Sequence, residues 1–268
     1  GGGINVSEAV KKLDVASVAL FPAGGHNGNM LCSLLKEEGI LFHAVDTKVE
    51  TRENWVMLDE STNNQYRFTF PGREVQQDAI VTLVDHIRSF SPAYVVASGS
   101  LPPGLPDYFY GLIVKQSKAV GAKCIVDTSG PALQALKGKG AYLIKPNIGE
   151  LCKMLEVEWL DKEEVPDAAR QAIKDGYAEL MAISMGPLGA WIVSNEEQYF
   201  AQAPDVPKRS TVGVRAALLV RRAPTDDRAT ADERRLVLLR FRFFHGRSDR
   251  LGVVAVDLEV PQLGVGDE

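Results

Sequence analysis

Short β-branched runs alternate with longer amphipathic stretches from about residue 15 to residue 200, and this alternation limits the folds open to the chain. Repeated strand–helix units build an α/β fold with a mainly parallel sheet and helices on both faces. In such sheets ligands bind beyond the carboxyl ends of the strands. The predicted strands are Ser17–Phe21, Ile40–Val45, Tyr94–Ala97, Lys123–Asp127, Tyr142–Lys145, Leu180–Ser184 and Ala190–Val193, and the predicted helices include Asn29–Glu38, Asp107–Val120, Pro131–Leu136 and Glu163–Asp175.

One segment, at about residues 44–72, breaks this alternation. Thr51–Leu58 and Gln65–Phe70 have the pattern of two strands, and the polar stretch Asp59–Asn64 between them suits a hairpin turn. Because no helix intervenes, we expect a small antiparallel flap attached to the main sheet. A flap of this kind closes over a ligand or pairs with a second subunit.

Composition narrows the class of protein. The chain has 268 residues, 45% of them hydrophobic, which suffices for one large domain. A net charge of -5 gives no reason to expect a nucleic-acid partner, and no apolar run reaches the roughly 18 residues that span a membrane. Cys32, Cys124 and Cys152 lie in apolar stretches without metal-ligand spacing, as expected for buried, reduced thiols of a cytoplasmic protein. The start is no signal peptide, and without an initiator Met we expect the chain to be cut there.

Three consecutive glycines, Gly1, Gly2 and Gly3, precede an apolar-periodic stretch, with Asn5 just after them. Glycines before a helix let backbone N–H groups approach a ligand, and a helix N-terminus favours anions. Asn5 would then offer an amide to a sugar hydroxyl. The alternative is a flexible terminus in which Asn5 caps the helix.

Two further motifs follow predicted strands at their carboxyl ends. The loop Ser98–Gly104, SGSLPPG, combines stiffening prolines with small hydrogen-bonding groups, although a rigid turn without a ligand has the same pattern. The segment Lys145–Glu150, KPNIGE, places Asn147 and Glu150 near a hydrated Mg²⁺ and Lys145 near nucleotide phosphates. Its alternative is a helix capping box formed by Asn147 and Glu150.

The remaining candidates are a glycine-rich turn and one arginine. The turn Ser184–Ala190, SMGPLGA, either places N–H groups against a phosphate or simply joins two strands. Arg52 opens the flap, where its guanidinium can grip a phosphate through two hydrogen bonds. The alternative is that Arg52 is a solvated surface side chain without a ligand.

Taken together and in order, these motifs resemble the phosphofructokinase-B (pfkB) family of ribokinase-like carbohydrate kinases. The resemblance runs from Gly1 to Gly213 through GGGINV, FPAGG, TRENW, QYRFTFPG, SGSLPPG, CIVDTSG, LIKPN, SMGPLGA and STVG. It implies transfer of the ATP γ-phosphoryl group to a ketose phosphate, first fructose 6-phosphate, with fructose 1-phosphate or tagatose 6-phosphate as alternatives. It also implies Mg²⁺, activation by K⁺ and a homodimer built through the flap.

The resemblance assigns residues to two ends of one crevice. For the sugar phosphate it implies Gly1, Gly2, Gly3, Asn5, Arg52 and Ser100. For ATP it implies Lys145, Asn147, Glu150, Ser184, Gly186, Gly189, Thr211 and Gly213, with Asn147 and Glu150 near Mg²⁺ through water. Asp127, at the end of a predicted central strand, is interpreted as structural support.

The likeness ends at Gly213. In the family, alanine, glycine and the catalytic aspartate follow this motif, whereas here Val214, Arg215 and Ala216 follow it, and Asp226 and Asp227 lie too far on. Residues 1–213 hold 14 Lys and 6 Arg, while residues 214–268 hold no Lys and 10 Arg. The interpretation is an incomplete kinase domain, 1–213, without its opening strand and its acidic sugar ligand, followed by an aberrant tail, 214–268.

Two hypotheses account for this combination. In the first, the chain is a kinase by descent whose sequence is truncated or frame-shifted, and it is inactive as written. In the second, it is a catalytically dead module that binds sugar phosphate or nucleotide for regulation. The coincidence of the composition change with the end of the motifs favours the first.

Overall fold

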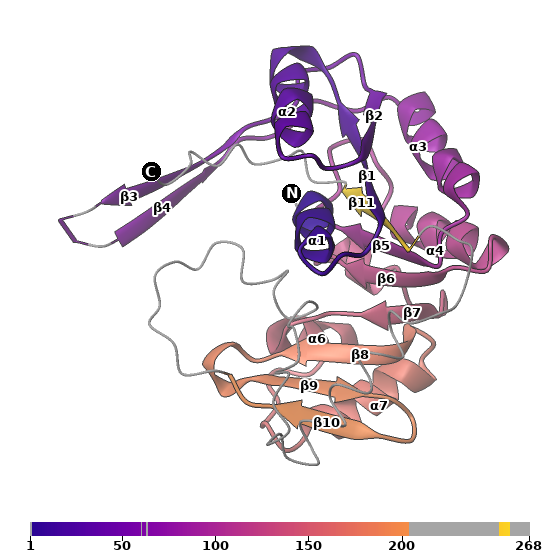
Figure 1. Ribbon diagram of the computed structural model, residues 1–268. Coiled ribbons are helices and arrows are strands. Elements are labelled where there is room, and N and C mark those ends of the chain that lie inside the picture. The colour runs from indigo at the N-terminus through magenta and orange to yellow at the C-terminus, as the bar shows by residue number, and fades with distance from the viewer. Residues whose placement is uncertain (1, 60, 63, 204–251, 258–268) are drawn as a thin grey trace.

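The computed structural model describes residues 2–59, 61–62, 64–203 and 252–257. Its centre is a sheet in the order β10-β9-β8-β7-β6-β5-β11-β1-β2 (Figure 1). All neighbours from β8 to β2 in this order are parallel, and the two pairs β8–β9 and β9–β10 are antiparallel. The strands are β1 (Ser17–Ala23), β2 (Phe42–Asp46), β5 (Tyr94–Ser98), β6 (Lys123–Asp127), β7 (Ala141–Ile144), β8 (Ala178–Ser184), β9 (Ala190–Val193), β10 (Gln198–Ala201) and β11 (Val253–Asp257).

Helices cover both faces of this sheet, as the strand–helix alternation predicts. Helices α1 and α2 pack on one face, and α3, α4, α5, α6 and α7 pack on the other. No helix in the described part of the chain is long and apolar enough to cross a membrane. The helices are α1 (Gly2–Lys11), α2 (Gly25–Glu37), α3 (Gln77–Phe90), α4 (Phe109–Ala119), α5 (Pro131–Gln134), α6 (Ile148–Leu155) and α7 (Val165–Lys174).

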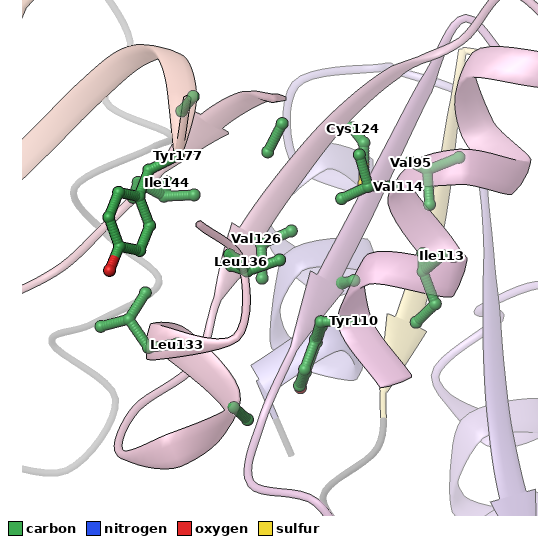
Figure 2. Packing of buried hydrophobic residues seen from close by; sticks show 14 of the residues in the cluster. Val95, Tyr110, Ile113, Val114, Cys124, Val126, Leu133, Leu136, Ile144 and Tyr177 are labelled. Carbon is green, nitrogen blue, oxygen red and sulfur yellow. The ribbon is translucent and has the colours of Figure 1, made fainter. Parts of the chain in front are cut away.

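The larger hydrophobic cluster lies on the α3–α7 face. Figure 2 shows part of it, where side chains of β5, β6 and β7 meet α4 and the segment around α5. Cys124 belongs to this cluster, and burial raises the pKa of its thiol to about 12. Cys124 and Cys152 are buried, Cys32 is half-buried, and all three are free thiols, as predicted.

Strand β11 comes from the segment 214–268, which the sequence interpretation treats as an aberrant tail. It lies between β1 and β5, parallel to both, and all five of its residues are fully buried. Val253 and Ala255 face α1, whereas Val254 and Val256 face the larger cluster. The slot between β1 and β5, inside the sheet, is therefore filled by a strand of this chain.

The predicted flap is present as a separate antiparallel pair that extends away from the sheet (Figure 1). It consists of β3 (Asn54–Asp59) and β4 (Asn64–Thr69). Asp59 fixes the turn, because its carboxylate accepts hydrogen bonds from the backbone N–H of Ser61 and the hydroxyl of Thr62. The flap was predicted because a polar turn between two β-branched runs is a local signal.

Helix starts were predicted less well. Helix α2 begins at Gly25, four residues before the predicted start, and its cap comes from Glu50 rather than from a neighbouring residue. Helix α1 begins at Gly2, so two of the predicted loop glycines lie in its first turn and Asn5 is not its cap. Both differences arise from contacts that are remote in sequence.

Val254 is fully buried in β11, between β1 and β5. We therefore expect Val254→Ala to lower the free energy of unfolding by about 2 kcal/mol. The matched control is Val81→Ala, since Val81 is 59% exposed on α3 and its truncation should change stability little. Urea denaturation of the full chain measures both. Equal effects of the two substitutions would show that β11 does not occupy the slot in solution.

Candidate functional site

The candidate residues gather along one edge of the sheet, where the parallel strands end. Strands β5, β6, β8 and β11 end at Ser98, Asp127, Ser184 and Asp257, and Lys145 follows β7 directly. Register places Ser98 beside both Asp127 and Asp257. This edge is where the sequence predicts a ligand to bind.

Helix α1 begins against this edge, and its glycines allow the close approach. A Cβ at Gly2 would lie 2.1 Å from Ser98 Oγ, and one at Gly3 would lie 2.7 Å from the carbonyl oxygen of Val256. Glycine is thus required at both positions for α1 to pack against the strand ends, in addition to any role in binding a ligand. Asn5 is exposed in the same first turns. Gly1 lies outside the described residues.

Asp257 is a site residue that the motifs did not identify. Its carboxylate is fully buried, and Oδ2 accepts a hydrogen bond of 2.9 Å from the backbone N–H of Ile4. A carboxylate at a helix N-terminus is stabilised by the helix dipole. The resemblance implies that the family's acidic sugar ligand is missing, whereas the tail strand places a different carboxylate, that of Asp257, beside α1. The available signal was the apolar run Val253–Val256, which ends in an acid.

The loop after β5 is held rigidly and meets the flap. The carbonyl oxygen of Gly99 accepts hydrogen bonds from the hydroxyls of Tyr110, at 2.6 Å, and Thr128, at 2.9 Å. Ser100 follows, and its Oγ accepts a 3.2 Å hydrogen bond from the guanidinium of Arg52. The structure therefore brings together two of the residues assigned to the sugar phosphate.

Two buried polar atoms at the root of the flap have no hydrogen-bond partner among the described residues. They are Nε of Arg52, a donor, and Oδ1 of Asn54, an acceptor. Asn54 is 7% exposed, is the first residue of β3 and lies two residues after Arg52. Since buried polar groups are nearly always paired, these two atoms call for a water molecule or a ligand as partner. The motifs singled out Arg52 as a candidate and did not single out Asn54.

Lys145 is paired with Asp127 at the centre of the edge. Their Nζ and Oδ1 atoms are 3.2 Å apart, and the side chains are 3% and 16% exposed. The resemblance assigned Lys145 to nucleotide phosphates and Asp127 to support. In the structure Lys145 is almost enclosed, and the ion pair fixes its position between the ends of β6 and β7.

Asn147 and Glu150 form the capping box that was one of the two interpretations. Asn147 Oδ1 accepts a 2.9 Å hydrogen bond from the N–H of Glu150, and Glu150 Oε2 accepts one of 2.7 Å from the N–H of Asn147. The cap therefore uses the single side-chain oxygen of Asn147 and one of the two carboxylate oxygens of Glu150. No group of three or more His, Cys, Asp or Glu side chains gathers to hold a metal anywhere in the described part of the chain. Asn147 and Glu150 therefore suit a Mg²⁺ ion that keeps its water ligands and contacts the two side chains through them. They suit direct coordination of the ion less well.

The glycine-rich turn lies beside this capping box. Ser184 and Asn147 form a bridge between the strand ends, and the N–H of Ser184 donates to the carbonyl of Pro146 at 3.0 Å. Gly186 and Gly189 adopt φ values of 58° and 109°, and a Cβ at Gly189 would lie 2.2 Å from the carbonyl oxygen of Ala201. The two segments assigned to ATP are thus neighbours. Thr211, Gly213 and the positions after them lie outside the described residues.

The mainly parallel sheet, its flap and this edge define a ribokinase-like fold, which the comparisons with known proteins confirm. A family model described as "pfkB family carbohydrate kinase" matches residues 1–217. The chain is 37% identical over 215 residues to ATP-dependent 6-phosphofructokinase isozyme 2 of Escherichia coli, covering 80% of this chain and 70% of that protein. It is 32% identical to 1-phosphofructokinase of Xanthomonas campestris, covering 82% and 70%.

Solved structures give the same result. Phosphofructokinase-2 of Escherichia coli in complex with fructose-6-phosphate matches with a TM-score of 0.75 at 35% identity, over 80% of this chain and 71% of that chain. Structures of the same protein with potassium and in a tetrameric inhibited form each match with a TM-score of 0.77 at 35% identity, over 82% of this chain and 72% and 73% of those chains. The chain belongs to the pfkB family of carbohydrate kinases.

The buried ion pair at the centre of the edge yields a prediction. Asp127→Asn leaves the ammonium of Lys145 enclosed without a counter-charge, which should cost about 3 kcal/mol of unfolding free energy. Asp175→Asn is the matched control, because it breaks the exposed pair with Lys137, and we expect no measurable change. Chemical denaturation of the two variants compares them. If Asp127→Asn proves as mild as the control, Lys145 is not enclosed in solution.

Proposed function

We propose that the crevice binds a ketose phosphate at its flap end and ATP at its β7–β8 end. The observation that carries this proposal is the pairing of Arg52 with Ser100 while the buried Nε of Arg52 has no partner within the described residues. A guanidinium with an unused, enclosed donor suits a phosphate, which offers several acceptors. The fructose-6-phosphate complex of the Escherichia coli protein supports this sugar phosphate as the first candidate. Fructose 1-phosphate, the substrate class in the name of the Xanthomonas relative, and tagatose 6-phosphate remain alternatives.

At the sugar end, the first turn of α1 and the loop after β5 complete the proposed pocket. Gly2, Gly3 and Asn5 lie where the N-terminus of α1 meets the strand ends, and Ser100 lies opposite them beside Arg52. Backbone N–H groups at a helix N-terminus suit the partial negative charges of a sugar phosphate. Gly1 belongs to the same proposed set.

At the nucleotide end, the N–H groups of Ser184, Met185, Leu188 and Gly189 already donate to backbone carbonyls, so the N–H of Gly186 is the one that would face a phosphate. Lys145 would hold its charge close to that phosphate. Asn147 and Glu150 would contact Mg²⁺ through water, and the ion would neutralise phosphate charge. Thr211 and Gly213 extend the same proposed set. The potassium complex of the Escherichia coli protein supports a K⁺ site, and the carbonyls near Ser210 and Val212 that we propose for it lie outside the described residues.

The reaction proposed for the family site is transfer of the ATP γ-phosphoryl group to a primary hydroxyl of the sugar phosphate. Positioning and charge stabilisation would supply most of the rate. In this chain Val214 and Arg215 occupy the places of the small residue and glycine that precede the family's catalytic aspartate. Ala216 falls where that aspartate would stand, and its methyl side chain cannot accept the hydroxyl proton. We therefore expect the chain as written to bind both ligands without turning them over.

Calorimetric titration with fructose 6-phosphate tests the sugar end. We expect Arg52→Ala to weaken binding by roughly tenfold or more, the effect of losing charge-assisted hydrogen bonds. Arg88→Ala is the control, because the Arg88 guanidinium bonds the neutral Gln116 instead. A parallel turnover assay with ATP should give no product. Unchanged binding by Arg52→Ala would refute the phosphate assignment, and turnover at a rate typical of an intact family member would refute the expected inactivity.

We also propose that the flap pairs two copies of this chain. Cross-strand register places Trp55 opposite Phe68 and Met57 opposite Tyr66, so the four side chains share one face. They are 45–57% exposed, and an exposed apolar sheet face of this kind is typical of an interaction surface. The tetrameric form of the Escherichia coli protein supports self-association, and we propose a dimer here.

Sedimentation analysis tests this association. We expect Phe68→Glu to yield monomer, because a carboxylate in the apolar face would have to be desolvated in the dimer. Trp159→Glu provides the control, since Trp159 is an equally exposed aromatic residue, at 64%, away from the flap. Loss of dimer in the control as well, or its persistence in Phe68→Glu, would contradict the flap as the interface.

A further inference from the structure

A short segment before the flap is tied to the start of α2 by reciprocal hydrogen bonds. The backbone N–H of Thr51 donates to the carbonyl of Gly24 at 2.9 Å, and the N–H of Gly24 donates to Thr51 Oγ1 at 3.0 Å. Asn27 Nδ2 donates to the carbonyl of Thr51 at 3.1 Å. Thr51 is buried, so these bonds are shielded from water. Its backbone and side chain are therefore fixed by α2.

Glu50 adds a second connection at the same place. Its carboxylate accepts hydrogen bonds from the backbone N–H groups of His26, at 3.2 Å, and Asn27, at 2.7 Å. Helix α2 has no side-chain cap at Gly24 and no acidic residue in its first turn. A carboxylate satisfies unpaired N–H groups at a helix start and interacts favourably with the helix dipole. Glu50 therefore supplies from the flap side the cap that α2 lacks locally.

Glycine makes this approach possible. A Cβ at Gly25, where φ is 68°, would lie 1.9 Å from Glu50 Oε2, and one at Gly24 would lie 2.3 Å from the carbonyl oxygen of Val49. Neither position accommodates a side chain while the connection is intact. The motifs FPAGG and TRENW, which are far apart in sequence, are therefore in direct contact through Gly24 and Thr51.

Arg52 directly follows Thr51, so the position of its backbone is set by these bonds, and its guanidinium extends to Ser100. We propose that Glu50 and Asn27 are positioning residues that hold Arg52 in the geometry that binds the substrate phosphate. We call Gly24, Gly25, Asn27, Glu50 and Thr51 the flap latch. The inference rests on the proposed role of Arg52. Glu50 and Asn27 act through Arg52 and touch no substrate themselves.

The test measures dissociation constants for fructose 6-phosphate on the full chain. We expect Asn27→Ala and Glu50→Gln each to weaken binding roughly three- to tenfold, because Arg52 samples other positions once the latch loosens. Asn29→Ala is the matched control, since Asn29 is an exposed asparagine on the same helix with no side-chain bond to the flap. Its binding should equal that of the parent. Circular dichroism and thermal melting of each variant confirm folding.

A double-mutant cycle separates positioning from a general structural role. If Asn27 acts through Arg52, Asn27→Ala should have no further effect in the Arg52→Ala background. An equal loss in both backgrounds, or no loss for either latch variant while Arg52→Ala weakens binding, overturns the latch and leaves the proposed function standing. Conversely, no binding by the parent, or no effect of Arg52→Ala, overturns the proposed role of Arg52 and the latch with it.

Discussion

The pairing of β11 with β1 on one side and β5 on the other is the interaction on which the rest of the structure depends. A parallel sheet with helices on both faces is stable only when every central strand has two neighbours and two covered faces. Without β11, the pair β1–β2 and the strands from β5 to β10 would have no backbone contact. The same register aligns Asp257 with Ser98, so the sugar end of the crevice is also set by this pairing.

Close backbone approach is the second constraint, and it explains why the crevice is rich in glycine. Gly2 and Gly3 let α1 start against the ends of β5 and β11, and Asp257 then satisfies an N–H group of that first turn. Gly25 lets Glu50 reach α2 in the same manner. In each case a carboxylate from a distant segment accepts hydrogen bonds from N–H groups at a helix start. The glycines that the motifs associated with a ligand are thus required, first of all, for close packing of the backbone.

The parts of the fold that were predictable have local signals. Strand–helix alternation, the flap and the capping box of Asn147 and Glu150 each depend on residues a few positions apart. The position of β11 was not predictable, because a five-residue apolar run does not reveal strand partners that are far away in sequence. For the same reason the cap of α2 by Glu50 and the enclosure of Lys145 by Asp127 required the structure. The motifs pointed to the strand ends, while long-range pairing determines which residues meet there.

The capping box also shows why structural and functional interpretations of a motif need not compete. Asn147 and Glu150 each use one oxygen for the helix start, which fixes both side chains before any ligand arrives. A side chain already held in one rotamer loses little entropy when a ligand binds. The bridge from Asn147 to Ser184 extends this order to the glycine-rich turn. A hydrated metal ion with phosphates would therefore meet a preorganised surface, and the cap that stabilises α6 is the feature that prepares it.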